Sequence, residues 1–297
     1  MSPRQVAQAI GVSESSLKRW CDKGDLLTAR TAGGHRRLPV DHVVQFLRQT
    51  GHPLIRPELL GLPSNTGQVP TITDRAATQI IEALTAGDEE QCRRIVFNLY
   101  LNGGTICEIC DRVLAPAFHE IGECWGCNEM EVYQERLACG FCLRILAELR
   151  SVIPAPAEDS PLAIGATPQC DPFMLPTAMV ELVFRQTGWR AQSLGSRLPF
   201  SSLVAAIKEL QPQIFWLSVS HIDDQQQFLD EYRWFYRQVC DRAAIIVGGR
   251  ALTESMRREM EYAAFCDNLK HMEAFIKAWK APTTPISSPT SRGDQDG

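Results

Sequence analysis

Residues 12–20 read Val-Ser-Glu-Ser-Ser-Leu-Lys-Arg-Trp, and residues 31–38 read Thr-Ala-Gly-Gly-His-Arg-Arg-Leu. The first stretch has the apolar spacing of a short helix, and Ser13 is a suitable N-cap for it. Gly33 and Gly34 in the second stretch suit a sharp reversal between two short strands. Together the two stretches predict a recognition helix followed by a basic wing, which are the parts of a winged helix-turn-helix.

Cations and short polar side chains gather in this window. Side chains on the recognition helix can reach base edges and phosphates in a major groove, and cations on the wing can contact the flanking phosphates or the minor groove. A cluster of cations is more often a solvated face, but here it coincides with helix-turn-helix spacing. We therefore expect double-stranded operator DNA as a partner. The expected contact residues are Arg4, Ser15, Ser16, Lys18, Arg19, Arg30, His35, Arg36 and Arg37.

The charge distribution favours contact with nucleic acid at one end only. The 297-residue chain has a net charge of −5, but residues 1–51 carry eight Lys and Arg against four Asp and Glu, which leaves −9 on the remainder. The N-terminus starts in a polar helical pattern rather than a signal peptide, and no apolar run approaches the roughly 20 residues that span a bilayer. We expect a cytoplasmic, nucleoid-associated bacterial protein with no membrane partner, whose eleven cysteines are mostly reduced.

Hydrophobic periodicity divides the rest of the chain. Helical spacing predicts a bundle of about four helices, and five β-rich runs then alternate with amphipathic helices. This alternation predicts a flavodoxin-like, doubly wound parallel sheet, so the fold class is multidomain α and α/β. The predicted strands are 162–166, 190–194, 214–219, 244–247 and 263–266. The predicted order is a DNA-binding domain over 1–51, a linker over 52–75, a helical bundle over 76–152, a linker over 153–160, an α/β domain over 161–280 and a disordered tail over 281–297.

The N-terminal motifs resemble those of the MerR family of transcription regulators. The resemblance covers roughly residues 3–51 and rests on Val-Ser-Glu-Ser-Ser-Leu-Lys-Arg-Trp followed by Gly-Gly-His-Arg-Arg-Leu-Pro. MerR-like proteins usually bind pseudo-palindromic sites as dimers or higher oligomers. The resemblance therefore implies a homodimer or a higher homo-oligomer.

Residues 76–280 resemble the cobalamin-binding module of methionine synthase. The domain order is similar to that of the light-sensing, cobalamin-dependent MerR-like repressors of carotenoid genes. In those relatives a Trp, nine residues and Glu-His mark the helical cap over the corrin. Here Trp125 and Glu135 are kept, but Arg136 stands where the resemblance places the histidine that binds cobalt from above.

The α/β half differs from its relatives in the same way. The family carries Asp-x-His-x-x-Gly after the first strand, and its histidine binds cobalt from below. In this chain Asp171 is kept and Phe173 takes the histidine position, so no lone pair is available there. The resemblance also implies a pocket for the nucleotide tail of the cofactor. Its expected lining residues are Ser218, Ser220, Gly248 and Gly249.

These replacements leave three interpretations of the module open. It binds a corrin without axial ligation from Phe173, it binds a different ligand, or its pocket has become a protein-interaction domain. Arg136 stays protonated and suits a carboxylate or phosphate partner. Its plain interpretation is an ion pair with a neighbouring acid other than Glu135, because adjacent helical residues diverge. Phe173 also has a plain interpretation, in which it fills the space of the imidazole.

Paired cysteines in the bundle form a second candidate site. Cys107 and Cys110 are three residues apart, as are Cys139 and Cys142, so each pair shares one face of a helix. Four thiolates could bind zinc, and a larger arrangement could hold an iron–sulfur cluster. Against this, cysteine often packs in cores, and the spacing between the pairs matches no compact zinc ribbon.

The leading hypothesis is a DNA-binding transcription regulator, not an enzyme, whose C-terminal module senses a signal or mediates oligomerisation. One alternative is a regulator that senses thiol chemistry or a metal through the cysteine pairs. An alternative from another class is a corrinoid carrier subunit of an enzyme. That carrier would need the cobalt-binding histidine that this chain lacks, and the sequence contains no convincing catalytic constellation.

Overall fold

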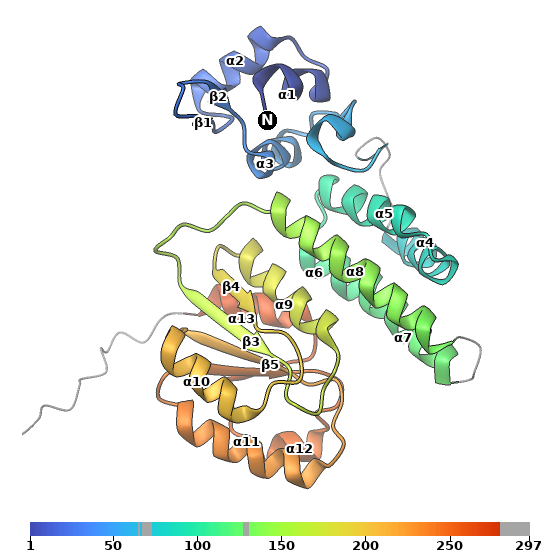
Figure 1. Cartoon of the computed structure of the whole chain (residues 1–297), viewed down its shortest axis with the longest axis vertical. Coiled ribbons are helices and arrows are strands. Elements are labelled where there is room, and N and C mark those ends of the chain that lie inside the picture. Colours follow the sequence, from blue (N-terminus) through green and yellow to red (C-terminus); the bar gives the residue numbers. More distant parts are fainter. Residues whose placement is uncertain (65, 67–72, 127–130, 280–297) are drawn as a thin grey trace, which may run out of the picture.

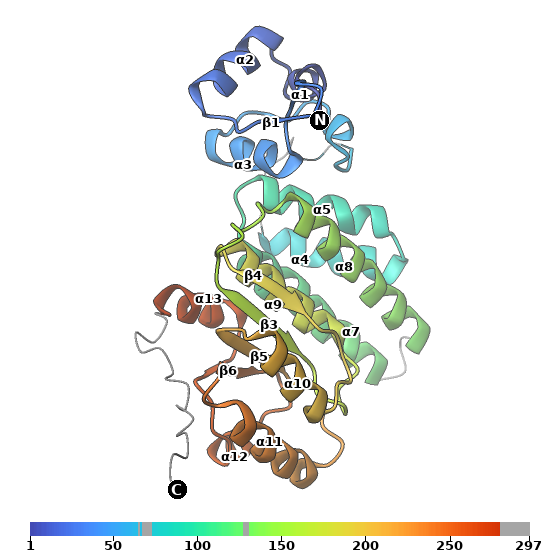
Figure 2. The same cartoon turned by 60° about the vertical axis from the view of Figure 1, so that its left-hand side comes forward.

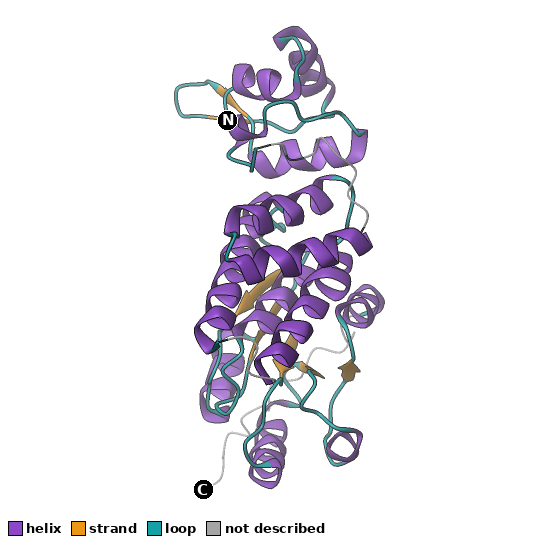
Figure 3. Ribbon diagram, turned by 90° about the vertical axis from the view of Figure 1, so that its right-hand side faces the viewer, coloured by secondary structure: helices purple, strands orange, loops and turns teal. Residues whose placement is uncertain are grey.

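Three packed units follow one another along the long axis of the molecule (Figure 1). The computed structural model describes residues 1–64, 66, 73–126 and 131–279, without the side chains of residues 73, 74 and 123–126. The N-terminal domain lies at one end, the helical bundle follows it, and the α/β domain lies at the other end (Figure 3). No helix in the described part is both long and apolar enough to cross a membrane.

The N-terminal domain has the predicted helices and wing. It contains helices α1 (Pro3–Ile10), α2 (Glu14–Lys23) and α3 (Val40–Thr50), and strands β1 (Ala29–Arg30) and β2 (Arg36–Arg37). Ser13 caps α2 as predicted, because its hydroxyl accepts a hydrogen bond from the Ser16 amide at 3.1 Å. Gly34 has a φ of +76°, a conformation that favours glycine, and lies in the turn that reverses the chain between β1 and β2.

Part of the proline-rich segment that the sequence predicts as a linker is packed instead. The amides of Ile55 and Arg56 donate to the carbonyl of Ala9 at 2.8 and 3.0 Å, and a short 3-10 helix, η1 (Pro57–Leu60), follows. The physical reason is a set of leucines whose burial against α1 outweighs the tendency of proline to keep a chain extended. The buried leucines are Leu54, Leu60 and Leu62. The N-terminal domain therefore extends beyond residue 51.

The helical bundle consists of four helical segments, as predicted. They are α4 (Thr73–Ala86), α5 (Glu89–Leu101), a continuous segment made of α6 (Ile106–Ile109), the π-helical turn η2 (Cys110–Leu114) and α7 (Ala115–Gly126), and finally α8 (Val132–Val152). The start of α8 lies at the same end of the bundle as the end of α7. This end is called the bundle tip below.

The α/β domain is a five-stranded parallel sheet with helices on both faces, as predicted. Its strands are β3 (Leu162–Ala166), β4 (Arg190–Ser193), β5 (Ile214–Ser218), β6 (Ala244–Gly248) and β7 (Ala264–Cys266), in the spatial order β4-β3-β5-β6-β7. Helices α9 (Met174–Gln186) and α13 (Leu269–Ala278) lie on the face toward the bundle. Helices α10 (Phe200–Leu210), α11 (Gln225–Val239) and α12 (Glu254–Arg258) lie on the other side.

Helix α9 joins the sheet to the bundle. Glu181 on α9 accepts a hydrogen bond from Arg150 on α8 at 2.6 Å and another from the Ser193 amide on β4 at 2.9 Å. At its far end, Gln186 accepts a hydrogen bond from the Ile106 amide at 2.9 Å. The orientation of the bundle over the sheet is therefore set by polar contacts as well as by apolar packing.

Arg48 connects the N-terminal domain to the bundle. Its guanidinium lies 3.9 Å from the centre of the Tyr100 ring, and its Nη1 donates to the carbonyl of Gly104 at 3.1 Å. Gly104 itself is needed by the tight turn after α5, since a Cβ there would lie 2.8 Å from the Leu99 carbonyl oxygen. This contact could not be predicted from the sequence, because a cation in a basic domain is expected to contact DNA or solvent.

Trp216 fills the layer between the sheet and α9. It is 1% exposed, its indole Nε1 donates to the Thr177 hydroxyl at 2.9 Å, and its ring stacks on Phe184 at 5.2 Å. Gly165 on the neighbouring strand makes this possible, because a Cβ there would lie 2.1 Å from the indole. The contact between the sheet and α9 therefore depends on one large and one absent side chain at adjacent positions.

Replacing this side chain tests the importance of the layer for stability. Trp216→Ala is expected to lower the free energy of unfolding by about 3–5 kcal/mol, because it removes a fully buried aromatic group and leaves a cavity. Trp234, which is 43% exposed on α11, is the matched control, and Trp234→Ala should change stability by less than about 0.5 kcal/mol. Urea unfolding followed by circular dichroism measures both. Equal losses in the two variants would contradict the assignment.

Candidate DNA interface and candidate ligand site

Helix α2 presents most of its predicted DNA contacts to solvent. Ser15, Lys18 and Arg19 are exposed, whereas Leu17 faces the core. Ser16 is half-buried; its hydroxyl lies 3.0 Å from that of Ser13 and also accepts from Arg19 Nη2 at 3.4 Å. The structure therefore gives Ser16 a role at the start of the helix, where it also accepts from Arg19, and all three of the other side chains are exposed to solvent.

The wing is attached to the recognition helix by an ion pair. Arg36 Nη2 lies 2.9 Å from the carboxylate of Asp22 near the end of α2, and both side chains are partly exposed. Arg30 and Arg37 are exposed on the two strands of the wing. Three cations of the wing and those of α2 therefore belong to one surface.

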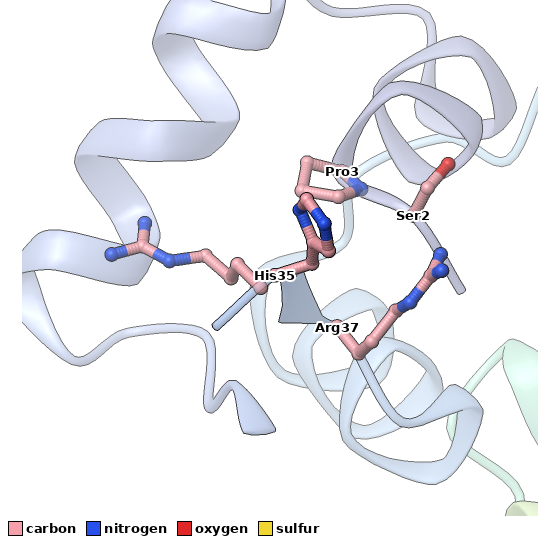
Figure 4. A pocket seen from close by; sticks show the side chains of 5 residues that line it. Ser2, Pro3, His35 and Arg37 are labelled. Carbon is pink, nitrogen blue, oxygen red and sulfur yellow. The ribbon is translucent and has the colours of Figure 1, made fainter. Parts of the chain in front are cut away.

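The start of α1 extends this surface. Ser2 and Pro3 line a shallow hollow of about 400 Å³ together with His35, Arg36 and Arg37 of the wing. In Figure 4 the imidazole of His35 lies next to Pro3, and the side chain of Arg37 extends toward Ser2. Arg4 is exposed on the first turn of α1. The predicted contact residues from α1, α2 and the wing are thus brought to one end of the molecule.

Asp171 organises the carboxyl edge of the sheet. It is 0% exposed, and its carboxylate accepts hydrogen bonds from the amides of Phe173 at 2.9 Å and Ser220 at 2.5 Å. Burial raises the pKa of this carboxyl group, and the backbone hydrogen bonds counteract part of that rise. Asp171 therefore holds the loops that follow β3 and β5 together, and its oxygens are already engaged.

The other predicted cofactor residues of this domain lie at the same edge. Ser218 is buried at the end of β5, and Gly248 ends β6. Gly249 has a φ of +117°, and a Cβ there would lie 2.1 Å from the Val219 carbonyl oxygen. This glycine is required by the close approach of two strand ends, whether or not a ligand is present. Phe173, half-buried, occupies the N-cap position of α9 without a side-chain capping hydrogen bond.

The predicted cap residues lie at the bundle tip. Glu135 and Arg136 are in the first turns of α8, with Arg136 Nε 3.8 Å from Glu135 Oε2. Although adjacent helical residues diverge, these two long side chains come within ion-pair distance of each other. Arg136 is largely exposed. The side chain of Trp125 lies outside the description.

At the two positions where the resemblance places cobalt-binding histidines, the residues present do not fit a cobalt ion. Phe173 has no lone pair, and Arg136 is a cation at ordinary pH. Trp216 lies two residues before Ser218 on β5. Its side chain fills the space between the sheet and α9. The half-buried Cys170 thiol at this edge donates to the His221 carbonyl at 3.5 Å, and the imidazole of His221 lies 2.8 Å from Asp223. A corrinoid held through histidine at position 136 or 173 is therefore chemically excluded.

The four cysteines proposed as metal ligands do not form a metal site in the described structure. Among the side chains that are described, no three His, Cys, Asp or Glu residues converge in a metal-binding arrangement. Cys107, Cys110 and Cys142 are buried in the bundle core, and burial raises the pKa of all three thiols, that of Cys107 to about 12. Cys139 is half-buried with a pKa raised to about 11 by burial. The predicted metal site is wrong for these four residues because the buried thiols pack in the bundle core as apolar groups do.

Comparison with known families identifies two segments of the chain. Residues 1–51 match a helix-turn-helix domain, and residues 76–150 match a B12 binding domain. The chain therefore combines an N-terminal helix-turn-helix domain with a B12 binding domain. No curated protein matches it.

Several solved structures are similar. The monomethylamine corrinoid protein of Methanosarcina barkeri is 12% identical, with a TM-score of 0.58 over 69% of this chain and 98% of that chain. A novel cobalamin-binding protein from Desulfitobacterium hafniense DCB-2 is 15% identical, with a TM-score of 0.36 over 70% of this chain and 98% of that one. The methanol:cobalamin methyltransferase complex MtaBC from Methanosarcina barkeri is 12% identical, with a TM-score of 0.38 over 78% of this chain and 90% of that chain. The first of these establishes a shared fold.

Thiol labelling tests whether the bundle cysteines are core residues. In the native protein at pH 8, iodoacetamide should modify the exposed Cys240 while Cys107, Cys110 and Cys142 stay unmodified, because only thiolates react and burial keeps these three protonated. Peptide mass spectrometry measures the extent at each site, and a denatured sample is the control. Rapid labelling of Cys110 and Cys142 in the native protein would revive the thiol-sensing alternative.

The raised pKa of Asp171 predicts a pH dependence. Its native state binds the proton more tightly than the unfolded chain, so protonation of this group stabilises the fold. The stability of the wild type relative to Asp171→Asn should therefore increase as pH falls from 7 through the native pKa toward the unfolded value of about 3.9. Urea unfolding of both proteins across this pH range measures the difference between their free energies of unfolding. The contributions of other carboxyl groups are common to both proteins and cancel in that difference. A difference that stays constant or shrinks on acidification would contradict the prediction.

Proposed function

We propose that this protein is a DNA-binding transcription regulator of the MerR type. Its N-terminal domain binds operator DNA, and its B12-binding module senses a signal or mediates assembly. The observation that carries the proposal is the single cationic surface formed by α1, α2 and the wing. The helix-turn-helix match over residues 1–51 supports the same function.

The position of the bundle is compatible with DNA binding. The bundle contacts α3, and in Figure 1 helix α2 and the wing lie at the end of the molecule away from the bundle. A duplex can therefore approach α2 without meeting the sensor module. Arg48 lies on α3, so a change in the bundle would reach the DNA-binding domain through its contact with Tyr100 and Gly104.

We further propose that the chain binds DNA as a homodimer or higher homo-oligomer, since two recognition helices are needed to read the two halves of a pseudo-palindromic operator. A corrinoid bound to this module would have to be held without cobalt coordination from residues 136 and 173. For that reason a corrinoid carrier subunit of an enzyme is the weaker proposal. We propose a non-enzymatic role for the chain.

Band-shift titration on the promoter region of the protein's own gene tests DNA binding. Arg19→Ala and Arg36→Ala should each weaken binding by about tenfold, and the slope of log K against log salt should become shallower by about 1 where the lost contact was to phosphate. Lys208→Ala, which removes an exposed cation on α10, is the matched control and should bind as the wild type does.

Either of two outcomes would contradict this proposal. One is the absence of a band shift with the wild type at low salt. The other is an affinity that stays the same in the Arg19 and Arg36 variants. Arg36 also pairs with Asp22, so Asp22→Ala shows whether a loss at Arg36 comes from the wing position rather than from the contact itself.

A further inference from the structure

The recognition helix α2 has few apolar anchors in its own domain. Leu17 is the one side chain of α2 that is fully buried, and most of the other residues of the helix are exposed. Trp20 and Cys21, about one turn further on, are half-buried and pack against the core. A helix with so few buried contacts opens locally at low cost in free energy. The contacts of Trp20 therefore decide how firmly α2 is held.

Three aromatic rings meet between α2 and the end of α3. The ring centroid of Trp20 lies 5.0 Å from that of Phe46 on α3 and 4.9 Å from that of His52. The rings of Phe46 and His52 are 5.7 Å apart and stack with an angle of 20° between their planes. Aromatic pairs attract one another at separations of roughly 4.5–7 Å, so all three contacts are favourable. Trp20, Phe46 and His52 are called the aromatic cluster below.

The backbone on both sides of His52 is fixed. Gly51 ends α3 with a φ of +67°, and its amide donates to the Leu47 carbonyl at 2.9 Å. Pro53 restricts the residue before it to extended conformations, and Leu54 is buried. The imidazole of His52 is exposed, but it stands on a short segment that has little freedom of its own. Its stacking on the other two rings therefore costs little conformational entropy.

The aromatic cluster also connects α2 to the helix that contacts the bundle. Figures 1 and 2 both show α3 between α2 and the bundle. Arg48, on α3 between Phe46 and His52, contacts Tyr100 and Gly104 of the bundle. Stacking is the interaction that the structure gives to the His52 side chain, whose imidazole makes no hydrogen bond or ion pair with another described residue.

We propose that His52 is a positioning residue for DNA binding, which acts by stacking on Trp20 and Phe46 and not by contacting DNA. The aromatic cluster fixes α2 before a duplex arrives, so less conformational freedom is lost on binding and the affinity is higher. Lys18 and Arg19, which are exposed on the same helix, are thereby held in place for the groove. The inference rests on the proposed function, because it adds a residue to that DNA-binding site.

Band-shift titration of the full-length protein, at a temperature at which every variant is folded, tests the proposal. His52→Ala should weaken operator binding by about fivefold, because α2 is then ordered only on binding. His52→Phe keeps a flat ring without a charge and should restore an affinity within about twofold of the wild type. The slope of log K against log salt should be the same in all three proteins, since no phosphate contact is lost.

Ile55→Ala is the matched control. Ile55 is another exposed side chain of the same segment, but it packs over Gly11 and lies outside the aromatic cluster. Its replacement removes apolar contact from the domain without touching Trp20, so it should lower stability and leave the affinity for DNA unchanged. Thermal melts of all variants measure the stability.

Amide hydrogen exchange without DNA provides an independent measurement. Peptides from α2 should exchange about fivefold faster in His52→Ala and at the wild-type rate in His52→Phe and Ile55→Ala, because only the first variant loses the stack on Trp20. Mass spectrometry of the digested protein gives the rates. If the wild type retards no DNA, the proposed function fails, whereas the exchange rates still decide whether His52 fixes α2.

Three results would overturn the positioning role. One is exchange of α2 in His52→Ala at the wild-type rate. Another is a loss of affinity in His52→Phe as large as that in His52→Ala with a shallower salt slope, which would make His52 a direct phosphate contact. The third is an equal loss of affinity in Ile55→Ala, which would make the effect a general loss of stability.

Discussion

The packing of Trp216 between the sheet and α9 is the contact on which the remaining architecture depends. The indole occupies space that exists only because position 165 lacks a side chain, and its one polar atom donates to Thr177 on α9. A buried indole N–H without a partner would cost stability, so this hydrogen bond and the apolar contact reinforce each other. Helix α9 is thereby fixed on the sheet, and the bundle is fixed on α9.

The same chain of contacts continues to the DNA-binding domain. Glu181 and Gln186 connect α9 to the bundle and to β4, and Arg48 connects the bundle to α3. Cation–aromatic and charge–carbonyl contacts of this kind are directional, so they hold a defined orientation better than apolar contact alone does. The α/β domain, the bundle and the helix-turn-helix domain are therefore joined by a continuous series of contacts.

Phe173 and Arg136 stand where the resemblance places the two cobalt-binding histidines, while Asp171 and Gly248-Gly249 match the motif. The structure gives each kept residue a role within the protein itself, since Asp171 binds loop amides and Gly249 relieves a clash with Val219. Residues of a cofactor motif can thus persist because the fold needs them, and their presence alone does not establish the cofactor.

Local patterns in the sequence determined the elements of this protein. The wing glycines, the Ser13 cap and the alternation of β-rich runs with helices are properties of neighbouring residues, so the predicted winged domain, bundle and five-stranded sheet agree with the structure. The exposure of Lys18 and Arg19 also followed from helical spacing. In contrast, the packing of residues 54–62 on α1, the contact of Arg48 with Tyr100, and the burial of Cys107, Cys110 and Cys142 depend on residues far apart in the chain. Only the tertiary structure decides such contacts, because a side chain's partners are set by how distant elements pack and not by its neighbours in sequence.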